Sequence, residues 1–222
     1  SQIANDHYGA ALEVSGSNNS IELWYGSYDS EEVNNDTTSN GNKNTVELQG
    51  INNAYFKNVS FHGGDIIKNW ITGTGGTGLS LGLTGNGIAV IDNVIGKNAN
   101  EITGGKANGG GGGTAFRLSG GSTFATNLYA TAGEGDDGNI SFTRDSGNAN
   151  VTMNGGNAIQ TTSANLSIHN GELTAKDGAV LIVQNAYDNY DWQVTLNASG
   201  GNGIIGGTGN GTVENLIIRA GD

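Results

Sequence analysis

The chain of 222 residues contains no cysteine and no proline. Without cysteine it cannot form a disulfide, a thiolate metal site or a cysteine nucleophile. Glycine is abundant at 40 residues, but it does not recur at every third position, so a collagen triple helix is excluded. No apolar run approaches the length of about 20 residues that a membrane-spanning helix needs, so we expect no direct membrane insertion of this chain.

Basic residues are also few. Nine Lys and Arg stand against 21 Asp and Glu, which gives a formal net charge of −12. The basic residues are dispersed singly, so no cluster is available to neutralise phosphates. We therefore expect no nucleic-acid partner and no adsorption to anionic membranes. The acidity favours solubility outside the cell.

Helical periodicity is missing as well, because glycine interrupts every window in which an amphipathic helix could extend beyond two turns. Instead, apolar residues alternate with polar ones in short packets that glycine and asparagine separate, for example at 10–16, 46–50, 114–120 and 164–175. A disordered chain has no reason to space such packets evenly. The pattern predicts an all-β protein.

Two all-β architectures fit the packets, a stacked parallel coil and an antiparallel sandwich. Asn-Gly pairs, such as those at Asn86, Asn154, Asn170 and Asn210, suit either, because they form hairpin turns and also accept the positive φ of coil corners. Similar packets recur after roughly 20 to 30 residues, which is typical of one solenoid turn. We therefore predict a single parallel β-helix over residues 1–222.

The alternation also predicts which positions face the interior and which stretches are loops. The stretches 26–44, 97–113 and 185–192 break the pattern and are predicted to protrude from the coil as loops, where binding functions commonly lie. The predicted interior positions are Val14, Leu23, Leu48, Phe61, Leu118, Leu128, Leu166, Ile168, Leu196 and Ile217.

The packets 11–21 (ALEVSGSNNSI) and 113–124 (GTAFRLSGGSTF) resemble the rungs of bacterial autotransporter passenger domains, which are right-handed parallel β-helices. The likeness covers most of the chain and rests on pattern and composition. It implies an extracellular adhesin or self-association module, carried to the outer membrane by a β-barrel translocator. Because a strand-like packet directly precedes Asp222, we expect the chain to be a fragment of a longer surface protein.

Aromatic and acidic residues cluster at two places. Aromatic faces stack on sugar rings or apolar side chains, while carboxylates accept hydrogen bonds from hydroxyls and amides. Both clusters are candidate ligand-binding sites, and the pattern favours the alternative, in which the aromatic rings cap the apolar interior or stack between turns. The clusters are Tyr187, Asp188, Tyr190, Asp191 and Trp192 in one stretch and Trp24, Tyr25, Tyr28 and Asp29 in the other.

One acidic motif is compatible with calcium. Asp136 and Asp137, in the segment GEGDDG at 133–138, partly resemble a calcium-binding nonapeptide, and carboxylates are ligands that Ca²⁺ prefers. No second copy of the motif stacks on the first, so a solvated acidic turn is the competing interpretation. We expect no other cofactor.

Two motifs look like enzyme signatures. The segment RDSG at 144–147 looks like the surroundings of a serine-protease nucleophile, but nothing marks any of the histidines at 7, 62 and 169 as a base. The segment GTGGTG at 73–78 matches a dinucleotide fingerprint, yet no helix is predicted after it. We therefore do not expect an enzyme.

Three functions remain in competition. The first is cell–cell self-association and biofilm-type aggregation, through repeated rows of Asn, Thr and Ser groups that pair between like rods. The second is binding of a host surface glycan or matrix protein through the aromatic loops. The third is a polysaccharide lyase or hydrolase, which requires carboxylates gathered on one face, whereas Asp92 stands nearly alone. We predict the first, at the bacterial cell surface.

Overall fold

A computed structural model describes the backbone of residues 2–5, 10–30, 33–35, 44–68, 75–92, 101–103, 112–134, 139–141, 149–152, 154–178, 182–184, 194–197 and 199–222. Side chains are described at 10–29, 44–65, 75–92, 112–134, 154–178 and 199–222. The described residues form strands and no helix, which confirms the all-β prediction.

The strands are β1 (Gln2–Asn5), β2 (Leu12–Val14), β3 (Asn19–Ser30), β4 (Val33–Asn35), β5 (Val46–His62), β6 (Ile66–Lys68), β7 (Leu79–Asp92), β8 (Glu101–Thr103), β9 (Phe116–Ser119), β10 (Ser122–Thr131), β11 (Asn139–Ser141), β12 (Ala149–Thr152), β13 (Ile159–Thr162), β14 (Asn165–Thr174), β15 (Ile182–Gln184), β16 (Val194–Asn197), β17 (Ile204–Gly206) and β18 (Gly211–Arg219).

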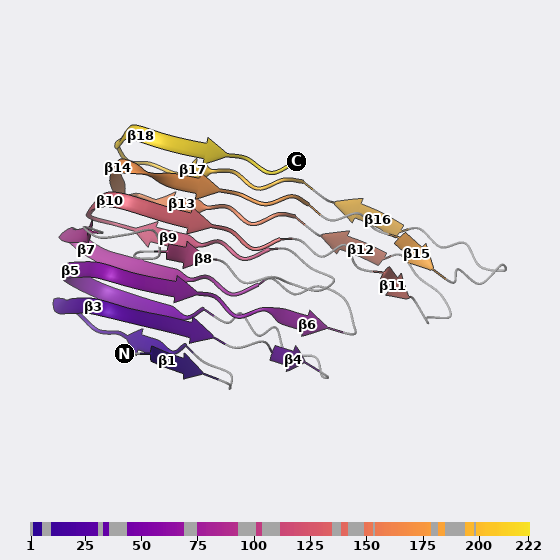
Figure 1. Ribbon diagram of the computed structural model, residues 1–222, viewed down its shortest axis with the longest axis horizontal. Helices are drawn as coiled ribbons and strands as arrows, with labels where there is room; N and C mark the ends of the chain where they lie inside the picture. Colours follow the sequence, from indigo (N-terminus) through magenta and orange to yellow (C-terminus); the bar gives the residue numbers. More distant parts are fainter. Residues whose placement is uncertain are drawn as a thin grey trace.

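Twelve of these strands form one parallel sheet that curls into a half-barrel. Strands β3, β5, β10, β14 and β18 lie one above another and run in the same direction, with β9, β13 and β17 behind them (Figure 1). The pairs β4–β6, β11–β15 and β12–β16 lie beside this stack. Every pairing among the described strands is parallel, which excludes the antiparallel sandwich for this part of the chain.

The chain returns to the same place in the sheet after a distance that grows along the sequence. Asn44 and Thr77 meet across 33 residues, Ser122 and Asn165 across 43, and residues of the last passes across 45. The predicted repeat of 20 to 30 residues fits the first return, where Gln2 pairs with Ser27 across 25 residues, and is too short for the later ones. The extra length belongs partly to excursions that the packets do not reveal, such as the segment of β11 and β12 between two passes of the main sheet.

Five of the long strands, β3, β5, β10, β14 and β18, bend at a residue with positive φ. Tyr25, Asn58, Asn127, Asn170 and Asn215 have φ between 51° and 61°, and the registers on either side place them at equivalent positions. Asparagine enters this left-handed region more easily than most residues, so it marks the bend. The Asn170–Gly171 pair is thus a corner of a parallel strand rather than a hairpin turn.

The bend explains why two predicted loops are partly wrong. The chain continues as a second strand arm after Tyr25, so residues 26–30 belong to β3 and 33–35 form β4. Within the predicted loop 97–113, residues 101–103 form β8 and the buried residues 112–113 belong to the stack. Only the polar character of these stretches was visible in the sequence, and outward-facing strand positions are polar too.

Glycines join the passes where the chain enters and leaves the sheet. The amide of Gly133 donates to the carbonyl oxygen of Gly113 at 2.9 Å, and Gly156 donates to Gly133 at 3.0 Å. The series continues through Lys176 to Gly156 at 3.3 Å and Gly201 to Lys176 at 2.9 Å. We call these hydrogen-bonded segments, around Gly113, Gly133, Gly156, Lys176 and Gly201, the alternating glycine segments. Their backbones approach so closely that a Cβ at Gly156 would lie 2.1 Å from the Gly113 carbonyl oxygen.

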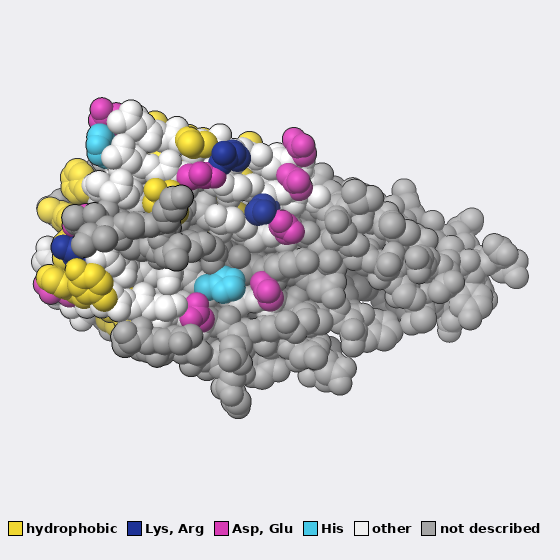
Figure 2. All heavy atoms as spheres, in the orientation of Figure 1, with side chains coloured by type: hydrophobic (Ala, Val, Ile, Leu, Met, Phe, Trp, Pro, Cys, Tyr) yellow, Lys and Arg dark blue, Asp and Glu magenta, His cyan; other side chains and the backbone are white. Residues whose placement is uncertain are grey.

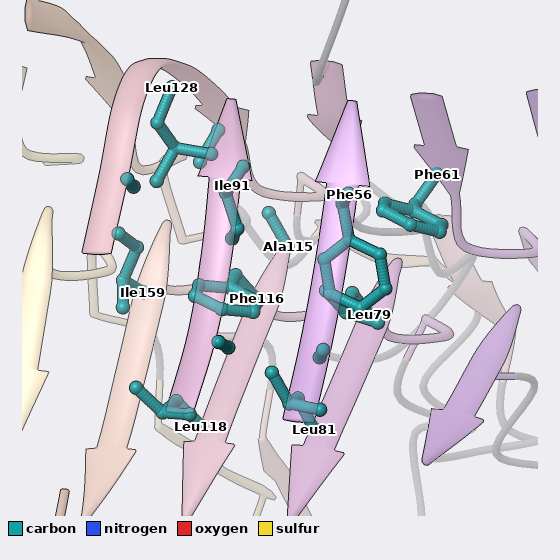
Figure 3. Close-up of a cluster of buried hydrophobic side chains, with 14 of the residues drawn as sticks. Phe56, Phe61, Leu79, Leu81, Ile91, Ala115, Phe116, Leu118, Leu128 and Ile159 are labelled. Atoms are coloured by element: carbon teal, nitrogen blue, oxygen red, sulfur yellow. The ribbon is translucent and has the colours of Figure 1, made fainter. Parts of the chain in front are cut away.

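The core lies inside the curl. The labelled side chains project from neighbouring strands into one interior layer, with Phe56 and Phe116 among the largest fully buried (Figure 3). Most predicted interior positions are confirmed: Leu23, Leu48, Phe61, Leu118, Leu128, Leu166 and Ile168 are buried, and Val14 packs against the core as a partly buried residue. Leu196 has no described side chain.

Ile217 is the interior prediction that is wrong, because its side chain is 52% exposed. In the register of β14 and β18, Ile218 pairs with the buried Leu173, whereas Ile217 pairs with Glu172 on the outer face. The bend at Asn215 resets the alternation, and three successive apolar residues at 216–218 do not show which of them faces inward.

Candidate ligand-binding surface

An apolar row crosses the outer face of the sheet. Tyr55 of β5 pairs with Val90 of β7, and Val90 pairs with Phe124 of β10. Residues in register on adjacent strands stack about 4.8 Å apart, so these three side chains stand in line. We call the surface around this row the aromatic patch; it consists of Trp24, Tyr25, Tyr55, Ile88, Val90 and Phe124.

Ring contacts hold part of the patch in one orientation. The rings of Trp24 and Tyr55 meet edge to face, with centroids 5.5 Å apart and an interplanar angle of 67°. The Nζ of Lys57 lies 5.8 Å from the centroid of the Trp24 ring, within the range of a cation–π contact. The Tyr55 hydroxyl donates a hydrogen bond of 3.3 Å to Oδ2 of Asp92. Polar groups of both charges therefore border the apolar row.

Four of the six side chains in the patch are about half exposed to solvent. Trp24 is 52% exposed, Tyr25 59%, Ile88 46% and Phe124 49%. Hydrophobic side chains gather at the left end of the molecule, with basic and acidic groups among them (Figure 2). Contiguous exposed apolar groups with a polar rim are typical of binding surfaces, and aromatic side chains lose little conformational entropy on binding because they rotate about only two χ angles.

The structure separates the predicted aromatic cluster at 24–29. Trp24 and Tyr25 are exposed and belong to the patch, whereas Tyr28 is only 7% exposed and stacks on Phe61 with ring centroids 5.7 Å apart. Tyr28 is therefore a core residue, because the bend at Tyr25 turns it inward, and burial raises the pKa of its hydroxyl. Asp29 is half-buried and accepts a hydrogen bond of 2.9 Å from the Ser27 hydroxyl.

The remaining predicted site residues lie outside the described part of the chain. They are Tyr187, Asp188, Tyr190, Asp191 and Trp192 of the second aromatic cluster and Asp136 and Asp137 of the acidic motif.

Sequence reasoning missed Tyr55 and Phe124. Tyr55 is followed by Phe56, and alternation alone does not decide which of the two rings faces outward. A usable signal was nevertheless present, because each residue stands three positions before the asparagine of its bend, Asn58 or Asn127. Aligning the packets on that asparagine places the two aromatic residues at the same outward position.

Among the described side chains, no three His, Asp or Glu residues are grouped closely enough to hold a metal ion. The exposed pairs Lys176–Glu134, at 2.8 Å, and His169–Glu214, at 3.2 Å, join successive passes of the chain. Such surface pairs contribute little energy individually.

Comparison of the chain with family models, with curated protein sequences and with solved structures finds no match. In the part of the chain described above, no helix has the length and apolarity needed to cross a membrane.

Proposed function

We propose that this chain is an adhesive module of a bacterial cell surface, not an enzyme, and that its aromatic patch binds a carbohydrate. We further propose that the curled sheet belongs to a right-handed parallel β-helix with protruding loops. The parallel registers, the repeated bend and the alternating glycine segments support this architecture, because each pass of the chain stacks only on its neighbours.

The observation that carries the binding proposal is the line of outward-facing Tyr55, Val90 and Phe124 beside the exposed Trp24. Flat apolar rings complement the apolar faces of sugar rings. The bordering Lys57 ammonium and Asp92 carboxylate are placed to bond ring hydroxyls, since one donates and the other accepts. The ring contact between Trp24 and Tyr55 and the hydrogen bond from Tyr55 to Asp92 orient these side chains before the ligand arrives, which lowers the entropy cost of binding.

The charge of the chain also favours a carbohydrate at this patch. At a net charge of −12, the protein repels acidic partners at long range, whereas a neutral glycan feels no such repulsion. We therefore place neutral surface glycans ahead of acidic ones as the ligand of the patch.

The test measures retention of the labelled chain on immobilised neutral glycans and on immobilised collagen. Trp24→Ala and Phe124→Ala should each weaken glycan binding at least about tenfold, as expected for aromatic residues central to an interface. Tyr129→Ala is the matched control, because Tyr129 lies outside the patch on the second arm of β10. Parental binding by both patch variants would reject the proposal, and retention on collagen alone would replace the glycan with a matrix protein.

Self-association is a second candidate function, favoured by polar side chains that form rows on the outside of successive passes. The hydroxyls of Ser163 and Thr208 lie 3.0 Å apart, and the Asn202 amide donates to Oδ1 of Asn157 at 3.3 Å. Such rows of hydroxyl and amide groups can pair with the same rows on another copy. Association should strengthen as salt screens the repulsion between like-charged rods.

Sedimentation at low and moderate salt, together with clumping of cells that display the chain, tests this second function. A monomer at every concentration, displayed on cells that do not clump, would reject it.

A further inference from the structure

A polar groove crosses β7, β9 and β13 at residues 80–81, 117–119 and 160–162. In each pass of the chain, these residues come before the corner that leads to the strand segments of the aromatic patch. The volume of the groove is about 360 Å³, near the lower end for small-molecule sites. The polar residues that line it are Ser80, Arg117, Ser119, Gln160 and Thr162.

The register explains why a groove forms here. Arg117 pairs with Ser80 on one side and Gln160 on the other, while Ser119 pairs with Thr162 in the next outward row. Between these rows, Leu81 and Leu118 carry side chains that project into the core (Figure 3). Short serine and threonine side chains thus adjoin the long side chains of arginine and glutamine, and the difference in length leaves a hollow over the sheet.

Gln49 borders this surface at the preceding strand. A Cβ placed on Gly82 would lie 2.1 Å from Oε1 of Gln49, so the Gln49 amide group covers the position where Gly82 has no side chain. Gly82 pairs with Ser119, which lines the groove. A further amide, able to donate and to accept, therefore stands close to the groove.

Arg117 supplies the positive charge of the groove. Burial lowers the pKa of its guanidinium and the Glu47 carboxylate raises it, but arginine remains protonated at neutral pH. Its Nε is buried and has no hydrogen-bond partner among the described residues, and no described carboxylate lies within ion-pair distance. By contrast, Lys176 and Arg219 are ion-paired with Glu134 and Glu172.

We propose that this groove is a second binding site, for a monoanionic sugar whose carboxylate sits on Arg117 and whose hydroxyls bond Ser80, Ser119, Gln160 and Thr162. The planar fork of a guanidinium matches a carboxylate with two parallel hydrogen bonds. Hydroxyl and amide side chains can both donate and accept, as sugar hydroxyls do. The nearby negative charge of Glu47 favours a monoanion over a dianion such as phosphate.

The test is titration of the full ¹⁵N-labelled chain with glucuronate, glucose and inorganic phosphate, following the Nε–Hε resonance of Arg117 by NMR. Glucuronate should shift this resonance in a saturable way, and glucose and phosphate should each bind at least about tenfold more weakly, since each lacks part of the ligand. Arg117→Gln should weaken glucuronate binding at least about tenfold, measured on the backbone amides of β9. Arg219→Gln removes an exposed arginine outside the groove and should bind as the parent does.

Arg117→Lys keeps the charge and loses the fork, so its affinity should fall between those of the parent and Arg117→Gln; this variant decides the test if the glutamine variant does not fold. No saturable shift with glucuronate would overturn the proposal. Equal affinity for glucose would remove the role of Arg117, and equal affinity for phosphate would leave a simple anion site without sugar recognition. The aromatic patch plays no part in this titration. A negative titration therefore rejects the groove site alone, and a negative glycan-retention test rejects the aromatic patch alone.

Discussion

Replacing Gly156 with alanine tests whether the alternating glycine segments hold the passes of the chain together. The new Cβ would lie 2.1 Å from the carbonyl oxygen of Gly113 and 2.9 Å from that of Gly133. Both obstacles are backbone atoms that themselves belong to the ladder, so no flexible side chain can move aside. The segments must separate by roughly an ångström before the methyl group fits.

The cost can be estimated from the contacts that this shift disturbs. Overpacking in a dense interior costs about 1–3 kcal/mol. The hydrogen bonds from Gly156 to Gly133, at 3.0 Å, and from Lys176 to Gly156, at 3.3 Å, contribute about 0.5–1.5 kcal/mol each. Alanine restores about 0.4–1 kcal/mol by restricting the unfolded chain. We expect a net loss of about 1–5.5 kcal/mol.

The assay is urea unfolding followed by circular dichroism, with Gly85→Ala as the matched control. A Cβ at Gly85 meets no atom within 4 Å, so this variant should stay within about 1 kcal/mol of the parent. In thermal melts, Gly156→Ala should unfold about 5–15 °C earlier. If both variants unfold at the parent's midpoint with an unchanged slope, the close approach at Gly156 does not exist in solution and the reasoning fails.

Three further predictions concern the core and the corners. Leu166→Asp places an unpaired charge at a buried position and should cost about 3–5 kcal/mol in urea unfolding, whereas Leu166→Met should cost less than about 1.5; equal midpoints would show that the register there is wrong by one residue. Burial raises the pKa of Tyr28 above its ordinary value of 10.0, so the neutral hydroxyl stabilises the fold below about pH 10 and this contribution is lost as the pH rises toward the folded-state pKa. Tyr28→Phe should therefore flatten the alkaline loss of unfolding free energy, and an unchanged slope would contradict that cause. Asn170→Ala should cost about 1 kcal/mol because φ is 61°, while Asn170→Gly should be nearly neutral, and the reverse order would contradict a left-handed corner.

The aromatic patch shows how far sequence patterns can locate a site. Trp24 and Tyr25 were recognisable because two large aromatic residues stand together in a polar stretch. Tyr28 belonged to the same stretch but lies in the core, and Phe124 stood alone in its packet. What joins Trp24 to Phe124 is the stacking of β3, β5, β7 and β10, and a side chain's neighbour on the next of these strands lies 33 to 35 residues away in the sequence.

The sequence by itself determined the all-β class and most of the interior positions, because alternation over a few residues is a local property that survives without knowledge of the partners. Only the tertiary structure decided the inner and outer faces near each bend, as at Ile217, because a left-handed residue shifts the alternation that follows it. The groove at Arg117 and the aromatic patch depend on register between passes. That register is set by backbone hydrogen bonds and by glycine contacts such as Gly156 against Gly113, which leave no periodic hydrophobic signal in the chain.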